Sequence, residues 1–139
     1  MAFDDAFPTA VTQLTTMAQW EAFFTGFSAD GVIPGVGLEM APYFDASTRT
    51  AGVAPGAAQI RGFRVEGPTH TSQPIPDAAA QNRIDRFVLR LNRAAATAAE
   101  WITPVVLTGT PGSAPIPPAL TQSLSGLFDI PMAPVDVWG

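Results

Sequence analysis

Prolines and glycines divide most of the chain into short segments, and this spacing limits the folds that it can adopt. The 139 residues include 14 prolines and 12 glycines, which imply numerous turns and short elements. Hydrophobic residues make up 47% of the chain and charged residues only 14%, so the chain can bury a core. These features favour a single β-rich domain over a helical bundle.

The charge of the chain argues against two classes of partner. The formal net charge is −5, and all seven basic residues are arginine. An acidic chain is a poor candidate for general nucleic-acid binding, because attraction to phosphate requires a basic surface. No apolar run approaches the ~18–20 residues that span a bilayer, and the N-terminus lacks the pattern of a signal peptide. We therefore expect no nucleic-acid partner, no membrane partner, and assembly in a cytoplasm.

The first 14 residues read as an extended arm that can lie on its own domain or on a neighbour. Polar residues and Pro8 separate its apolar positions. These candidate contacts with another subunit or with a particle are Phe3, Phe7, Val11 and Leu14. We expect the arm to act as a strap, because an extended segment reaches ~3.3 Å per residue.

Residues 15–27, TTMAQWEAFFTGF, carry the best local helix pattern. Thr16 can cap the helix N-terminus, and Gln19 three residues later fits a capping box. One face collects apolar residues at spacings of three and four, namely Met17, Trp20, Phe24 and Phe27. A helix of this length is marginal alone, so we expect the stripe to pack on the core or, in part, on another subunit.

Beyond residue 37 the chain changes to short runs separated by turn signals. The expected strands are residues 38–44, 49–53, 57–66, 103–109 and 127–138, the last being one strand or two. Gly62 inside the third run predicts a bulge or a close approach of the backbone. Residues 67–81 are expected to form a loop. Residues 15–139 are therefore predicted to be one β-rich domain that follows the arm of residues 1–14.

The segment NRIDRFVLRLNRAAATAAEW, residues 82–101, fits two structures. Its four arginines are spaced as on a helix, and AAATAAE is a strong helix former. On a strand, Phe87, Leu89 and Leu91 share one face, whereas Arg86 and Arg90 share the other. Periodicity leaves both structures open and slightly favours the helix.

Three segments in order resemble a module of tailed-bacteriophage structural proteins: VAPGAAQIRGF, NRIDRFVLRLNR and PVVLTGTPGSAPIPPALTQ. The chain is similar to the N-terminal domain of actinobacteriophage tail-fibre, baseplate and minor tail proteins, and to related capsid-surface proteins. The resemblance covers roughly residues 15–133. It implies an antiparallel β-sandwich or barrel in which RIDRFVLRL is a strand, although AAATAAEWIT is longer than the tight connection expected after that strand.

On the strand that the resemblance implies, Arg86 and Arg90 lie on one face, where they can form cross-strand pairs with carboxylates. A solvated, locally paired strand face is the favoured interpretation. The alternative is that these two arginines meet acidic groups on a neighbouring subunit.

A search for catalytic patterns identifies no catalytic, cofactor-binding or metal-binding residue. Cysteine is absent, and the only histidine, His70, lies in a polar segment. No serine lies in a G-x-S-x-G motif, and GVIPGVG lacks the Lys-Ser/Thr of a phosphate-binding loop. Nothing distinguishes a catalytic pair among the candidate carboxylates Glu66, Asp77, Asp85 and Glu100. We therefore expect no enzymatic activity and no cofactor.

The resemblance favours a virion structural protein located on the particle surface and assembled in the host cytoplasm. Because the chain stops at Gly139 without a shaft or receptor-binding tip, we expect a capsid decoration or head-fibre-like protein. The alternatives are a short tail-fibre or baseplate protein and a carbohydrate-binding module that uses Trp20, Trp101 or Trp138. The expected partners are the chain itself, as a homotrimer, and the major capsid protein or tail and baseplate proteins.

Overall fold

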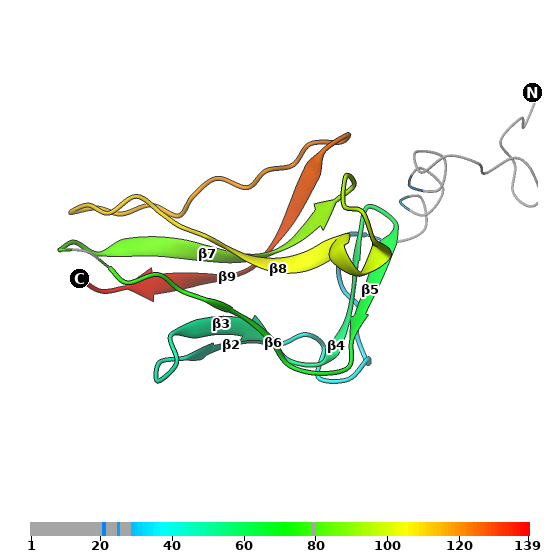
Figure 1. Ribbon diagram of the computed structural model, residues 1–139, viewed down its shortest axis with the longest axis horizontal. Coiled ribbons are helices and arrows are strands. Elements are labelled where there is room, and N and C mark those ends of the chain that lie inside the picture. The colour runs from blue at the N-terminus through cyan, green and yellow to red at the C-terminus, as the bar shows by residue number, and fades with distance from the viewer. Residues whose placement is uncertain (1–20, 22–24, 26–28, 79) are drawn as a thin grey trace, which may run out of the picture.

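The computed structural model describes Glu21, Thr25 and residues 29–78 and 80–139, and this part is mainly β. Figure 1 shows its three sheets, each of which contains three antiparallel strands. The prediction of a mainly β, antiparallel fold is confirmed. The arm expected at residues 1–14 lies outside the described residues, as does the helix expected at residues 15–27 apart from Glu21 and Thr25.

The first sheet has the order β1 (Gly31–Val32), β4 (Gly56–Ile60) and β5 (Phe63–Gly67). The second has the order β2 (Pro42–Asp45), β3 (Thr50–Val53) and β6 (Thr71–Pro74). The third has the order β8 (Ile102–Leu107), β7 (Arg83–Asn92) and β9 (Leu127–Val137). A short 3₁₀ helix, η1 (Ala98–Glu100), precedes β8.

The second and third sheets face each other, and the β4–β5 hairpin closes one end of the space between them (Figure 1). All three sheets contribute to one apolar core. Its buried members are Met40, Ala51, Val53, Ala58, Ile60, Ile75, Phe87, Leu89, Leu91, Ile102, Ile130, Val135 and Val137. The domain therefore buries side chains from segments that are far apart in the sequence.

Strand β7 settles which structure residues 82–101 adopt. The ten residues Arg83–Asn92 of this segment form the central strand of the third sheet, and Phe87, Leu89 and Leu91 all lie in the core. The strand implied by the resemblance is confirmed, whereas the slight preference of periodicity for a helix is wrong. Pairing on both edges and burial of the alternate apolar residues outweigh the helical spacing of the arginines. The alanine-rich part instead forms the connection that contains η1.

Residues 57–66 are two strands rather than the single bulged strand expected. Ile60 pairs with Phe63, so Arg61 and Gly62 alone form the turn between β4 and β5. Both have positive φ angles, 50° and 83°, which is the type I′ turn that suits a two-residue hairpin. Gly62 is therefore a turn residue and not a bulge.

The bulge lies in β9. Phe87 pairs with Ala133 and Val88 pairs with Pro131, which leaves Met132 as the extra residue. The expected loop at residues 67–81 is also partly wrong, because Thr71–Pro74 pairs with β3. Its polar sequence gives no apolar alternation, which explains why the pattern predicted a loop.

Candidate functional site

The two arginines predicted as contacts lie on the outer face of β7 but differ in their surroundings. Arg90 donates from Nε to Asp129 Oδ1 at 2.7 Å and from Nη2 to Oδ2 at 2.9 Å. The hydrogen bond with Asp129 raises the pKa of Arg90, against the effect of burial. Arg86 is half-buried, and its side chain makes no hydrogen bond or ion pair with the residues that the structure describes. The predicted contacts in the arm, Phe3, Phe7, Val11 and Leu14, lie outside the described residues.

Asp129 also fixes one end of the chain that joins β8 to β9. It is the cross-strand neighbour of Arg90 and is fully buried. The backbone N–H of Thr121 donates to Asp129 Oδ2 at 3.0 Å, and the N–H of Asp129 donates to the Thr121 carbonyl at 2.7 Å. One buried carboxylate thus joins β7, β9 and the connection between β8 and β9.

Asp85 fixes the other end of the same connection. It is fully buried and accepts from Arg83 Nε at 2.9 Å and Nη2 at 3.1 Å. The N–H of Gly109 donates to Asp85 Oδ1 at 2.8 Å. A Cβ on Gly109 would lie 2.1 Å from the Ile84 carbonyl oxygen, so only glycine permits this approach.

We call residues 110–120, between these two attachment points, the clamped loop. It runs along the third sheet on the side away from β2 and β3 (Figure 1). Ile116 is 73% exposed within it, and the loop contains no charged residue. Two buried carboxylates therefore hold an uncharged, proline-rich segment over the outer face of the sheet.

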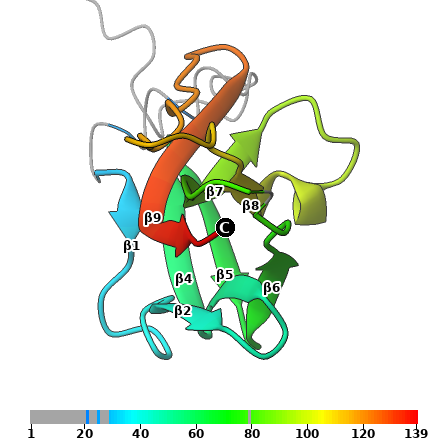
Figure 2. The same ribbon diagram turned by 90° about the vertical axis from the view of Figure 1, so that its left-hand side faces the viewer.

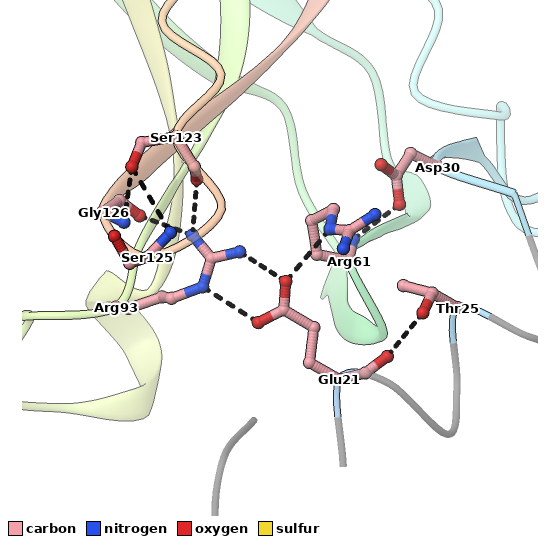
Figure 3. A network of polar contacts seen from close by, with 8 residues as sticks. All are labelled: Glu21, Thr25, Asp30, Arg61, Arg93, Ser123, Ser125 and Gly126. Carbon is pink, nitrogen blue, oxygen red and sulfur yellow. Dashed lines mark hydrogen bonds and ion pairs between the residues drawn. The ribbon is translucent and has the colours of Figure 1, made fainter. Parts of the chain in front are cut away.

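A third polar network attaches Glu21 to Arg93, which follows β7, and to Arg61 in the turn between β4 and β5. Figure 3 shows the guanidinium groups of Arg93 and Arg61 around its carboxylate. Arg93 Nε donates to Glu21 Oε2, and Arg61 Nε donates to Glu21 Oε1, both at 3.0 Å. Arg93 also donates to the carbonyls of Ser123 and Gly126. Burial raises the pKa of the Glu21 carboxyl, but the hydrogen bonds and charges of the two arginines outweigh it and hold that pKa below its usual range.

Replacing Glu21 with glutamine should reduce the free energy of unfolding at pH 7 by about 1–3 kcal/mol. A carboxyl whose pKa is lowered by folding stabilises the protein above its unfolded-state pKa and loses that contribution as the pH falls through the folded-state pKa. The difference between wild type and Glu21→Gln should therefore shrink as the pH drops below 4.5, the ordinary value for this group. Urea unfolding across pH 3–7 measures it.

The matched control is Glu66→Gln, because Glu66 pairs with Arg64 at the surface with both side chains 55% exposed. Such a pair contributes less than about 1 kcal/mol. A Glu21→Gln effect equally small at pH 7, or constant down to pH 3, would contradict the buried two-arginine site.

An apolar groove lies between the free edges of β2 and β9, and we call it the β2–β9 groove. Its volume is about 260 Å³. Its lining residues are Pro42, Tyr43, Phe44, Ala51, Phe87, Ala133, Pro134, Val135 and Asp136. Phe44 is 53% exposed at its rim, and Asp136 is the only charged residue among the described ones that line it. A groove with this lining fits an apolar segment better than a charged ligand.

Trp138 stands at one end of the molecule with 74% of its surface exposed. A hollow lies on either side of it, and one of them extends to Phe44, Arg49 and Ile75. The other extends to Asn82, Ile84 and Pro115. Figure 2 views the molecule from this end, which we call the Trp138 end.

The other two tryptophans offer no comparable surface among the described residues. Trp101 packs edge-on against Phe63, with ring centroids 5.4 Å apart, and its Nε1 donates to the Ala95 carbonyl. Trp20 lies outside the described residues. Of the three candidate stacking platforms, the structure therefore exposes Trp138 and packs Trp101 onto the domain.

Titratable residues do not converge on a reaction centre in the part of the chain that the structure describes. His70 is exposed, and its ring packs roughly perpendicular to the Tyr43 ring with the two ring centroids 5.5 Å apart. Two of the candidate carboxylates form surface ion pairs, Glu66 with Arg64 and Asp77 with Arg49. Within the described ranges no three His, Asp or Glu residues are placed to hold a metal ion, and no helix is long and apolar enough to cross a membrane.

Sequence reasoning missed the buried role of Asp85 and Asp129. It treated Asp85 as one of four candidate carboxylates and did not consider Asp129. A usable signal was present, because each aspartate stands inside an apolar strand, in RIDRF and LFDIP. A carboxylate in such a position requires a buried partner.

No protein-family model matches the chain, and no significant match is found among curated proteins or solved structures.

Proposed function

We propose that the chain is a non-enzymatic structural protein on the surface of a bacteriophage particle, acting as a capsid decoration or head-fibre-like protein. The Trp138 end carries this proposal. A large indole that is 74% exposed between two hollows has the chemistry of a protein-binding hot spot. The three segments that resemble phage virion proteins supply the choice of partner, the major capsid protein.

The internal ion pairs support an assembly role. Arg83, Arg90 and Arg93 are each held by a carboxylate within the chain. Their charges therefore stiffen the domain instead of forming a substrate site. We further propose that the two facing sheets make an antiparallel β-sandwich, a scaffold that presents its ends and loops to partners.

Mass spectrometry of purified capsids and purified tails from the encoding phage should find the chain with the capsids. Trp138→Ala should then bind to empty capsids at least tenfold more weakly in cosedimentation, because a central tryptophan contributes ~2 kcal/mol or more. Leu124→Ala is the matched control, since Leu124 is 69% exposed elsewhere on the surface. Detection only in tails would replace this proposal with the short tail-fibre or baseplate role, and absence from both would overturn it.

A carbohydrate-binding module is the second candidate, and one observation favours it. Asp136, Asn82 and Arg49 line the hollows beside Trp138, so polar groups surround an exposed ring on which a sugar can stack. Quenching of tryptophan fluorescence by host-surface glycans, lost in the same Trp138→Ala variant, would favour this function over capsid binding.

A further inference from the structure

The prolines of the clamped loop restrict the backbone around Ile116. Three prolines flank it in the sequence Pro115-Ile116-Pro117-Pro118, and each fixes its own φ angle near −65°. Residues 113–120 make no hydrogen bond with any described residue, so their polar backbone groups are free to meet a partner. Because Asp85 and Asp129 fix the two ends of the loop, little conformational entropy is lost when Ile116 binds.

The β2–β9 groove has the complementary chemistry. Proline-rich segments dock in grooves lined by aromatic side chains, and the partly exposed Phe44 lies at the rim of this groove. Pro42 and Pro134 complete its walls, and Phe87 also lines it. Its volume of about 260 Å³ accommodates an isoleucine side chain together with part of a neighbouring proline.

The near absence of charge on the clamped loop and the groove favours contact between copies at these two surfaces. The chain has a net charge of −5, so most surface approaches between two copies are repulsive. The clamped loop has no charged residue, and Asp136 is the one charged residue among the described residues that line the groove. An acidic chain can therefore meet itself through this loop and this groove at little electrostatic cost.

The loop does not occupy the groove of its own chain. Among the described residues, those that line the groove come from β2, β3, β7 and β9, and none comes from residues 110–120. We infer that Ile116 and its flanking prolines of one copy insert into the β2–β9 groove of the next. Such a head-to-tail contact is heterologous and closes into a ring when the rotation permits. The inference identifies the surfaces through which copies of the proposed assembly protein contact one another. It rests on the proposed function only for the expected number of copies, which is three.

Light scattering coupled to size exclusion tests the contact on the full chain. Wild type should self-associate, whereas Ile116→Asp and Phe44→Asp should each be monomeric, with affinity at least about tenfold weaker. An equimolar mixture of the two variants should form a heterodimer and stop there, because it retains one intact loop facing one intact groove. Leu124→Asp, at an equally exposed apolar site outside the loop, should associate like wild type.

Three results would each overturn the inference: a wild-type chain that stays monomeric at every concentration, a Leu124→Asp variant that is equally impaired, or a mixture that stays monomeric. Circular dichroism confirms that the variants are folded, and Ile116→Ser with Phe44→Ser replaces any aspartate variant that is not. No phage particle enters this experiment. Loss of capsid binding with intact self-association would therefore reject the proposed function alone.

Discussion

Replacing Asp85 with alanine should lower the free energy of unfolding by about 3–5 kcal/mol. Asp85 is completely buried, and its partner Arg83 is only 4% exposed. Removing the carboxylate leaves the guanidinium buried without its counter-charge, and it also removes the acceptor of the Gly109 N–H. The penalty is large because water cannot replace the lost partner at this depth. Denaturant titration of the purified variant measures the change.

Asp77→Ala is the matched control for this prediction. Asp77 is also an aspartate paired with an arginine, Arg49, but its side chain is 82% exposed. Its removal should change stability by less than about 1 kcal/mol. A double variant, Arg83→Met with Asp85→Leu, should recover part of the loss, because it removes both charges together. Equal effects of Asp85→Ala and Asp77→Ala would show that the Arg83–Asp85 pair is not buried in solution.

The β architecture could be predicted because its cause is local. Prolines and glycines limit element length wherever they occur. Periodicity alone did not identify β7, because its arginine spacing also fits a helix, and only the resemblance indicated a strand there. Strand β6 could not be predicted in this way. Thr71–Pro74 has no apolar alternation and is a strand only because it pairs with β3. The turn at Arg61–Gly62 left a recognisable glycine signal, but a glycine in a bulge leaves the same one.

The candidate surfaces depend on contacts between residues far apart in the sequence, and such contacts cannot be predicted from a single sequence. Arg90 finds Asp129 39 residues away, and Asp85 finds Gly109 24 residues away. The β2–β9 groove likewise forms only where two separate strand edges meet. The sequence did identify Arg86 and Arg90 as residues that pair with carboxylates either within the chain or on a neighbouring subunit. The fold places the partner of Arg90 within the chain and leaves Arg86 without a partner among the described residues.

The two buried aspartates link the arginine pairs of β7 to the clamped loop. Each buried aspartate accepts hydrogen bonds both from an arginine on β7 and from a backbone N–H of the connection between β8 and β9. Charge buried inside the domain thus determines the position of an uncharged segment on its surface. Replacing Asp85 or Asp129 should therefore weaken self-association even in a variant that still folds.

Two phenylalanines of the β2–β9 groove should respond oppositely to truncation. Phe87 is 1% exposed and belongs to the core, so Phe87→Ala should cost about 3–5 kcal/mol through lost burial and a residual cavity. Phe44 is 53% exposed at the rim of the same groove, so Phe44→Ala should cost less than about 1 kcal/mol and instead weaken self-association. Denaturant titration and light scattering on both variants separate the two effects. Equal losses of stability would show that the groove is closed in solution, whereas unchanged self-association of Phe44→Ala would exclude its ring from the contact.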